Sequence, residues 1–262
     1  MPELPDVETF KRYLDTTSLH QQISGVHVQS AYVLKGVSAR ELAHRLKGRC
    51  FESSRRHGKH LFVRADGELW LRLHFGMTGS LQYFKREEEA SKHTRVLFVF
   101  ASTHCLAFED QRKFGEVGLV KDVDEFLRKR ALGPDALDVS LSQFREIFEK
   151  HRGAVKAILL NQKLIAGIGN IYADEILFRV RMHPATEISR LGSKPFTKLF
   201  RATRYILEKA IAAKADLNQM PKSWLLPHRG KGGKCPRCGC ELKSSRIGGR
   251  TAWFCGNCQK RI

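Results

Sequence analysis

Acidic residues are scarce in this sequence. Its 262 residues include 27 Asp and Glu against 46 Lys and Arg, which leaves a formal net charge of +19 at pH 7. Such an excess of positive charge indicates a polyanionic partner, and nucleic acid is the first candidate. Hydrophobic residues make up 42% of the chain, which is enough to build packed cores, so a wholly disordered protein is excluded.

Long apolar runs are also missing. No stretch approaches the roughly 18–20 apolar residues that a membrane-spanning helix needs. The first ten residues, MPELPDVETF, have neither the basic start nor the apolar segment of a secretory signal. We therefore expect a protein of the cytoplasm or nucleoid without a membrane partner.

The cysteines are odd in number, which argues against a disulfide framework in a chain without a secretion signal. Four of the seven form two Cys-x2-Cys pairs with sixteen residues between them: Cys235, Cys238, Cys255 and Cys258. Two such knuckles supply four thiolates in a tetrahedron, which is typical of one structural Zn²⁺ ion. A pair of unmetallated redox dithiols is the alternative. We interpret Cys50 and Cys105 as small core residues and Cys240 as a spare thiol.

Apolar and polar residues alternate over much of residues 24–120, which is typical of β-strands. A short helix over residues 6–14, capped by Asp6, precedes them. Asp66-Gly67 has the sequence of a hairpin turn. Short strands joined by turns favour an antiparallel sandwich or barrel. The strands that we expect are His60–Arg64, Leu69–Leu73, Ser80–Phe84, Arg95–Ala101, Cys105–Phe108 and Glu116–Val120.

The apolar period becomes helical after Leu132-Gly133-Pro134-Asp135, which we interpret as a boundary. A first helix capped by Ser142 is expected, followed by helices over Ala154–Gln162, Asn170–Arg179 and Pro195–Ala213. The glycines of Ala166-Gly167-Ile168-Gly169-Asn170 would expose backbone N–H groups just before a helix, which favours a phosphate contact. An ordinary tight turn is the alternative.

Basic residues are concentrated near both ends of the chain. Residues 229–262 hold nine Lys and Arg against one Glu, and residues 35–64 hold nine against two. A metal-stapled basic hairpin is too small for a core of its own and suits a DNA backbone. Each run alone could be a solvated face, but two together fit a DNA-binding cleft better.

Pro2 becomes a secondary amine at the chain start if Met1 is removed. An α-amine titrates near roughly 7.7–8.0, so much of it is unprotonated at neutral pH and can attack an electrophilic sugar carbon to give a Schiff base. Glu3 could move the protons that such chemistry requires. Proline at position 2 is common, so these residues alone predict little.

Six motifs occur in order along the whole chain. They are MPELPDVE at the start, Arg56-His57-Gly58-Lys59, His74-Phe75-Gly76-Met77-Thr78-Gly79, Asp110-Gln111-Arg112-Lys113-Phe114-Gly115, Ala166-Gly167-Ile168-Gly169-Asn170-Ile171-Tyr172 and the cysteine hairpin. Together they resemble the formamidopyrimidine-DNA glycosylase / endonuclease VIII family, and the formamidopyrimidine branch more closely. The resemblance implies an α+β fold with three domains. These are an N-terminal two-layer antiparallel β-sandwich (1–133), a helix-two-turn-helix domain (134–226) and a zinc-finger β-hairpin (227–262).

The resemblance also implies a bifunctional DNA glycosylase and AP lyase of base excision repair. Such an enzyme excises oxidised purines (8-oxoguanine and formamidopyrimidines) and nicks the abasic site by β,δ-elimination. Its partner is double-stranded DNA that contains oxidised bases or abasic sites, and the family suggests a monomer. Three alternatives stay open: a preference for oxidised pyrimidines, a non-catalytic lesion-binding relative, and a zinc ribbon joined to an unrelated enzyme.

Motif matching assigns a role to nine residues besides the zinc ligands. Pro2 resembles the nucleophile that attacks C1′, Glu3 the acid/base, and Lys59 the lysine that contacts the phosphate beside the lesion. Further phosphate contacts correspond to His74, Asn170 and Arg250. The residues that fill the space left by a flipped nucleotide correspond to Met77, Arg112 and Phe114. By pattern alone, Met77 and Phe114 would sooner belong to the core.

The sequence departs from the family at a few positions. Asp6 replaces a glutamate, Gln111 a proline and Lys113 an arginine. The segment Ala213–His228 is shorter than the loop that closes over 8-oxoguanine in well-known members, which leaves the range of lesions open. Trp224 in that segment could stack on a base or anchor the loop.

Overall fold

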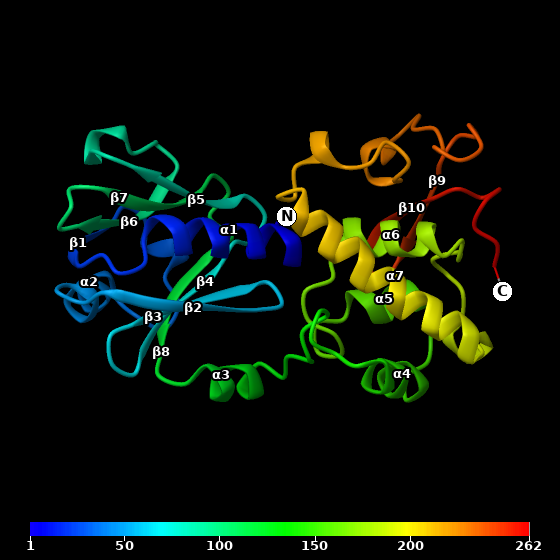
Figure 1. The fold of residues 1–262 in the computed structure, drawn as a ribbon, viewed down its shortest axis with the longest axis horizontal. Helices are drawn as coiled ribbons and strands as arrows, with labels where there is room; N and C mark the ends of the chain where they lie inside the picture. Colours follow the sequence, from blue (N-terminus) through cyan, green and yellow to red (C-terminus); the bar gives the residue numbers. More distant parts are fainter. Residues whose placement is uncertain (262) are drawn as a thin grey trace. The chain divides into compact units, whose positions relative to one another are not determined.

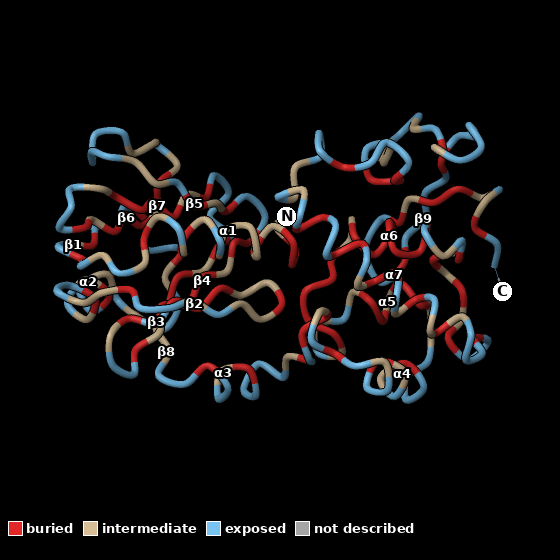
Figure 2. The backbone as a smooth tube through the Cα atoms, in the orientation of Figure 1, coloured by how far each residue is buried: buried red, intermediate tan, exposed pale blue. Residues whose placement is uncertain are grey.

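The computed structural model describes residues 1–261 and divides into two compact units (Figure 1). Met1–Pro2 and Asp6–Ala131 form the first unit, and Glu3–Pro5 and Leu132–Ile262 form the second. Residue 262, the last of the expected zinc domain, lies outside the described residues. Each unit has its own buried interior, drawn in red in Figure 2. No helix within residues 1–261 is long and apolar enough to cross a membrane.

Two four-stranded antiparallel sheets build the first unit, in the orders β1-β6-β7-β5 and β2-β3-β4-β8. One apolar cluster contains residues of both sheets, such as Leu71 of β4 and Phe98 of β6. The predicted sandwich within an α+β fold is confirmed. The strands are β1 (Ile23–Val28), β2 (Phe51–His57), β3 (His60–Ala65), β4 (Leu69–His74), β5 (Gly79–Phe84), β6 (Thr94–Phe100), β7 (Cys105–Asp110) and β8 (Glu116–Val120).

One longer helix and four short ones accompany these sheets in the described part of the chain. They are α1 (Leu4–Thr17), η1 (Ala31–Val33), α2 (Ala39–Leu46), η2 (Glu87–Glu89) and α3 (Val123–Lys129). Helix α1 begins at Leu4, so the expected cap, Asp6, lies inside its first turn. Val7 and Leu14 of α1 are fully buried in the sandwich core. Cys105 is buried as expected, whereas Cys50 is only half-buried.

Helices build most of the second unit. They are α4 (Leu141–Glu149), α5 (Val155–Leu160), α6 (Asn170–Arg179), η3 (Ile188–Arg190), α7 (Ser193–Ala212), η4 (Leu217–Gln219) and η5 (Leu226–His228). The cap of α4 is Ser140 and not Ser142, because Ser140 and Gln143 form a reciprocal capping box. Trp224 is 4% exposed and belongs to the helical core, so it anchors its segment and is not available to stack on a base.

A two-stranded hairpin ends the chain. Strands β9 (Lys243–Ile247) and β10 (Arg250–Phe254) pair antiparallel and are joined by Gly248-Gly249. Both glycines have positive φ (58° and 74°), the conformation that a two-residue hairpin turn requires. A small apolar cluster around Cys235, Leu242 and Cys255 also includes Phe178 of α6, so the hairpin packs on the helices.

Candidate functional site

The Glu3 carboxylate is held at the start of α6. Glu3 is 1% exposed. Its Oε2 accepts hydrogen bonds from the backbone N–H groups of Gly169 (2.9 Å) and Tyr172 (3.2 Å), and its Oε1 accepts one from Ile171 (3.0 Å). The first N–H groups of a helix have no partner within the helix, and its dipole favours negative charge there. These bonds fix the carboxylate and stabilise its charge.

The two glycines before α6 leave the space that Glu3 and Leu4 occupy. A Cβ atom at Gly169 would lie 2.1 Å from the Glu3 carboxyl carbon, and one at Gly167 would lie 2.5 Å from Leu4 Cδ1. Gly167 also has a φ of 110°, which side chains rarely adopt. The anion at this turn is therefore a carboxylate of the chain itself. The phosphate contact that we expected from the two glycines is wrong, because Glu3 accepts the N–H of Gly169 and Gln162 Oε1 accepts that of Gly167, each at 2.9 Å.

Pro2 directly precedes this fixed carboxylate in the chain. Pro2 is half-buried, and Met1 is 46% exposed. The backbone N–H of Leu4 donates to the Gly167 carbonyl at 3.1 Å, which ties the chain just after Glu3 to the glycine turn. The Pro2 nitrogen is part of a peptide bond as long as Met1 is present, so nucleophilic chemistry requires the removal of Met1.

Lys59 lies in the tight turn between β2 and β3. His57 and His60 pair across the hairpin, which leaves Gly58 and Lys59 as its two turn residues. Gly58 has the positive φ (55°) that such a turn requires. Arg56 braces the turn, because its guanidinium donates to the Gly58 carbonyl (3.4 Å) and forms an ion pair with Glu8 of α1 (2.9 Å).

His74 ends β4 and is neutral at physiological pH. Burial lowers its pKa to about 4, the nearby charges of Arg72 and Lys59 add to the shift, and Glu116 opposes it. Its Nδ1 accepts the backbone N–H of Gly76 at 3.3 Å, so the ring proton resides on Nε2. A neutral N–H group of this kind can donate a hydrogen bond to a phosphate oxygen.

Met77, Arg112 and Phe114 lie on two loops that share one buried carboxylate. Asp110 accepts hydrogen bonds from Thr78 Oγ1 (2.5 Å) of one loop and from the Arg112 (3.2 Å) and Gly115 (2.6 Å) N–H groups of the other. Met77 and Phe114 are 38% and 55% exposed, so the alternative that they are core residues does not hold. The Arg112 guanidinium lies 5.0 Å from the Phe114 ring centre.

Asn170 and the turn of the β9–β10 hairpin meet in the second unit. Asn170 is the first residue of α6, and its side-chain amide donates to the Thr251 carbonyl at 3.1 Å. Arg250, directly before Thr251, is exposed at the start of β10. The structure thus brings together two of the expected phosphate contacts, at a helix N-terminus and on a basic hairpin.

A buried ion pair, which the sequence reasoning missed, holds this hairpin. Lys156 and Asp174 are fully buried and 2.5 Å apart, and Arg229 approaches Asp174 at 2.8 Å. Lys156 also donates to the Thr251 carbonyl (3.3 Å), and Asp174 accepts the N–H of Trp253 (3.0 Å). Burial lowers the pKa of Lys156, and Asp174 opposes that shift. The signal was a single lysine within the otherwise apolar helix VKAILL.

The four knuckle cysteines form one cluster. The ligand atoms of Cys235, Cys238, Cys255 and Cys258 all lie within 4.8 Å of one another, with two sulfur pairs at 3.5 and 3.9 Å. A tetrahedron of Zn–S bonds of roughly 2.3 Å places sulfurs about 3.8 Å apart, so the cluster fits one structural Zn²⁺. Cys240 is exposed and outside the cluster, as expected for a spare thiol.

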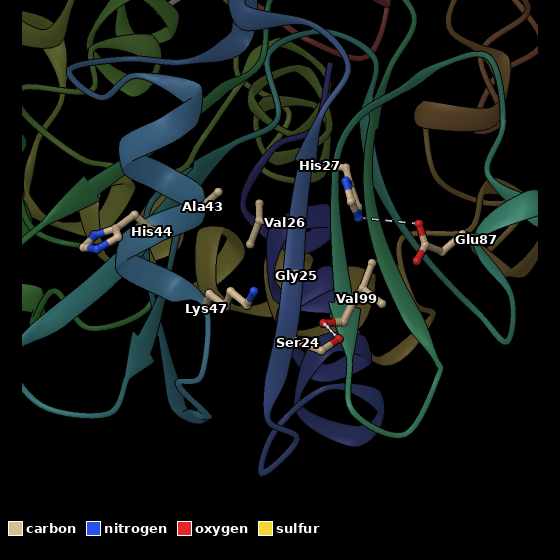
Figure 3. Close-up of a pocket in the computed structure, with 9 residues that line it drawn as sticks. All are labelled: Ser24, Gly25, Val26, His27, Ala43, His44, Lys47, Glu87 and Val99. Atoms are coloured by element: carbon tan, nitrogen blue, oxygen red, sulfur yellow. Dashed lines mark hydrogen bonds and ion pairs between the residues drawn. The ribbon is translucent and has the colours of Figure 1, made fainter.

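One open hollow of the first unit contains none of these residues. It has a volume of about 450 Å³ and lies between β1 and α2, with His27, His44 and Lys47 on its walls (Figure 3). His27 approaches Glu87 at 3.6 Å, and both side chains are largely exposed. We assign no role to this hollow.

Three family models match the chain in sequence. The formamidopyrimidine-DNA glycosylase N-terminal domain matches residues 1–117, the H2TH domain of the same family matches 132–221, and a zinc finger found in FPG and IleRS matches 232–261. Among curated relatives, the formamidopyrimidine-DNA glycosylase of Pelotomaculum thermopropionicum is 31% identical over 99% of both chains. That of Listeria innocua is 33% identical over 99% of this chain and all of the relative.

Solved structures of the Lactococcus lactis Fpg have the same fold. Its complex with DNA that contains N7-benzyl-Fapy-dG has a TM-score of 0.89, and its complex with Fapy-dG DNA has 0.88. Both are 29% identical and cover 99% of this chain and 100% of the other. Domain models, full-length relatives and fold agree with the motifs, and this chain belongs to the formamidopyrimidine-DNA glycosylase family.

Proposed function

We propose how this chain, a DNA glycosylase of base excision repair, performs its reaction. It excises oxidised purines, such as 8-oxoguanine and formamidopyrimidines, and then nicks the abasic site through a Schiff base on Pro2. It acts on double-stranded DNA as a monomer, with the three domains at 1–133, 134–226 and 227–262. One observation carries the proposal: a buried carboxylate, fixed by three backbone N–H groups, directly follows a half-buried proline at position 2.

The first steps form the Schiff base. With Met1 removed, the Pro2 nitrogen attacks C1′ of the damaged nucleotide, and the bond from C1′ to the base breaks as the base leaves with a proton taken from water. The Glu3 carboxylate accepts the N–H proton that Pro2 loses and passes it to the ring oxygen O4′, so the sugar opens and an iminium forms between Pro2 and C1′. Because Glu3 is fixed at the start of α6, its reach toward the sugar is set before the substrate binds.

The later steps cut the strand. Loss of a C2′ proton from the iminium expels the 3′ phosphate, and a second elimination expels the 5′ phosphate. Water then hydrolyses the Schiff base and frees Pro2. Lys59, presented on a two-residue turn, offsets the phosphate charge beside the lesion. His74, Asn170 and Arg250 supply further phosphate contacts.

The exposed trio stabilises the flipped state. A nucleotide must leave the stack before Pro2 can reach its sugar, and unstacking costs a few kcal/mol. Met77 and Phe114 are exposed on braced loops and can wedge into the vacated space. Arg112, beside Phe114, can donate hydrogen bonds to the orphaned base.

Borohydride trapping on 8-oxoguanine duplexes tests the nucleophile. We expect a covalent adduct with the processed wild-type enzyme, and none with Pro2→Gly or with a form that keeps Met1. An unchanged adduct in Pro2→Gly would assign the chemistry to another amine, and Lys59→Ala would then test whether that amine is Lys59. Intact mass spectrometry of the active enzyme provides the control, because an unprocessed Met1 in active protein contradicts the proposal.

One observation favours the second candidate, a preference for oxidised pyrimidines. The short segment 213–228 is fixed by the buried Trp224, and Glu175 accepts the N–H of Leu226 at 2.8 Å. A segment held in this way is poorly suited to close over a purine. Excision rates on duplexes with 8-oxoguanine, formamidopyrimidine or oxidised pyrimidines separate the two: a clear preference for pyrimidines would replace the first candidate.

A further inference from the structure

Four cationic side chains surround a hollow of about 460 Å³ in the second unit. Arg179 and Arg181 come from the C-terminal end of α6 and the turn after it, and Lys198 and Arg201 come from α7. All four are exposed. The other lining residues are Val180, Ala202 and Tyr205, so no carboxylate lines the hollow.

None of these four cations forms a salt bridge with any residue of the described chain, 1–261. Their neighbour Arg204, in contrast, is paired with Glu208 at 3.3 Å. Like charges held close together repel each other, and a bound anion relieves that repulsion. The hollow is therefore a site of unbalanced positive charge rather than part of a surface ion-pair network.

Helix stability explains only half of this arrangement. Arg179 lies at the C-terminal end of α6, where the helix dipole favours positive charge. Lys198 and Arg201 lie beyond the first turn of α7, where the helix dipole has little effect. The dipole therefore gives no reason for these two cations, whereas an anionic partner does.

Tyr205 adds a rigid aromatic surface beside the charges. It is 36% exposed, and the Arg179 guanidinium lies 3.7 Å from its ring centre. The stacked pair orders the guanidinium, and the ring can contact a sugar or a base. Four cations among seven lining residues do not suit a protein interface, whose core is depleted in charge, but they suit a phosphate backbone.

We propose that this hollow binds the backbone of a second duplex DNA segment, separate from the one that Asn170 and Arg250 contact. Asn170 and Arg179 are the first and last residues of α6, about 13 Å apart along the helix axis. The inference rests on the proposed function, since it takes the Asn170 end to be the site for damaged DNA. An enzyme that holds two segments can pass from one to the other without complete release.

The test uses the full chain, already saturated with a short duplex that contains a stable abasic analogue. A fluorescent undamaged duplex is then added, and anisotropy reports its binding. We expect Lys198→Glu/Arg201→Glu to weaken this second binding by about tenfold or more, and Lys198→Ala/Arg201→Ala by less. Single-turnover excision on a short lesion duplex should stay within about twofold of wild type.

The matched control is Lys85→Glu/Arg86→Glu, which reverses one exposed Lys and one exposed Arg directly after β5, outside both basic runs of the sequence. Equal weakening in this control would mean that net charge alone matters, and an equal loss of excision in the α7 variant would mean that one DNA site includes the hollow. Either result overturns the proposal. So does an α7 variant that loses binding of polyglutamate but still binds the undamaged duplex as tightly as wild type. Pro2→Gly should bind the second duplex as wild type does. A failure of the proposed Pro2 chemistry can therefore be distinguished from a failure of the second DNA site.

Discussion

At the scale of single residues, the glycine before α6 is a position that does not tolerate a side chain. The Glu3 carboxylate occupies the space that a side chain at residue 169 would need. A carboxylate that accepts three backbone N–H groups cannot shift without losing them. The position of this group thus depends on a residue that contributes no side chain of its own.

Gly169→Ala should therefore abolish most of the excision activity. The added methyl would lie 2.1 Å from the Glu3 carboxyl carbon, and displacing a catalytic group by about 1 Å costs on the order of a hundredfold in rate. Single-turnover excision measures the effect, and affinity for an undamaged duplex should change much less. Gly192→Ala is the control, because nothing lies within 4 Å of the Cβ that it adds. Equal activity in both variants would refute the role of the carboxylate.

His74 makes the stability of the sandwich depend on pH. Its pKa is about 4 in the folded chain against an ordinary 6.5, so below pH 6.5 the unfolded chain binds a proton that the folded chain does not. The stability contribution is present above pH 6.5 and falls between pH 6.5 and 4, by up to roughly 3 kcal/mol.

Thermal unfolding at a series of pH values checks this expectation. His74→Gln should lose stability less steeply than wild type between pH 6.5 and 4, because it removes the titrating group. His44→Gln, at an exposed position of α2, should follow wild type. Parallel curves for wild type and His74→Gln would contradict the assignment.

At the scale of elements, the sequence predicts those with a regular apolar pattern. Strands β3 to β8 and helix α6 lie within two residues of their expected ends, because their buried side chains recur with a clear period. Strands β1 and β2 were not expected individually. A register shift after Ile23 interrupts β1, and β2 buries only Phe51 among mostly polar residues. Its partner β3 provides the pairing that its own sequence does not indicate.

The zinc hairpin should respond to metal loss as a separate element. Its core is small, so the four thiolates and their ion supply much of its stability. Cys255→Ser should lower DNA affinity severalfold while the sandwich unfolds at its normal temperature. Anisotropy and thermal unfolding measure the two properties, and chelation of the wild-type protein should have the same effect. Unfolding of the whole chain after chelation would show that the metal supports more than the hairpin.

At the scale of the whole molecule, charge is the property that the sequence predicts best. The net charge of +19 already indicates a polyanion, and the ordered motifs narrow it to DNA. The contacts that hold the site are less predictable. The ion pair of Lys156 with Asp174 and the hydrogen bond from the Gly169 N–H to Glu3 join residues 18 and 166 positions apart, and no local pattern carries such information.

Binding to undamaged duplex should depend steeply on salt. With about six phosphates neutralised, affinity should fall by roughly a thousandfold between about 50 and 200 mM monovalent salt. Titrations at several salt concentrations give the slope. Arg250→Ala should reduce the slope of log affinity against log salt concentration by about one, as expected for the loss of one phosphate contact. A flat response would contradict a backbone-binding surface.

The Thr251 carbonyl has an evolutionary consequence. It accepts hydrogen bonds from Lys156, Asn170 and Arg229, yet every residue type carries a carbonyl in its main chain. The exposed side chain at residue 251 is thus free to drift among descendants of this gene, while its three donors are not. Substitutions at residue 251 should therefore be tolerated, whereas substitutions at the three residues that donate to its carbonyl should not.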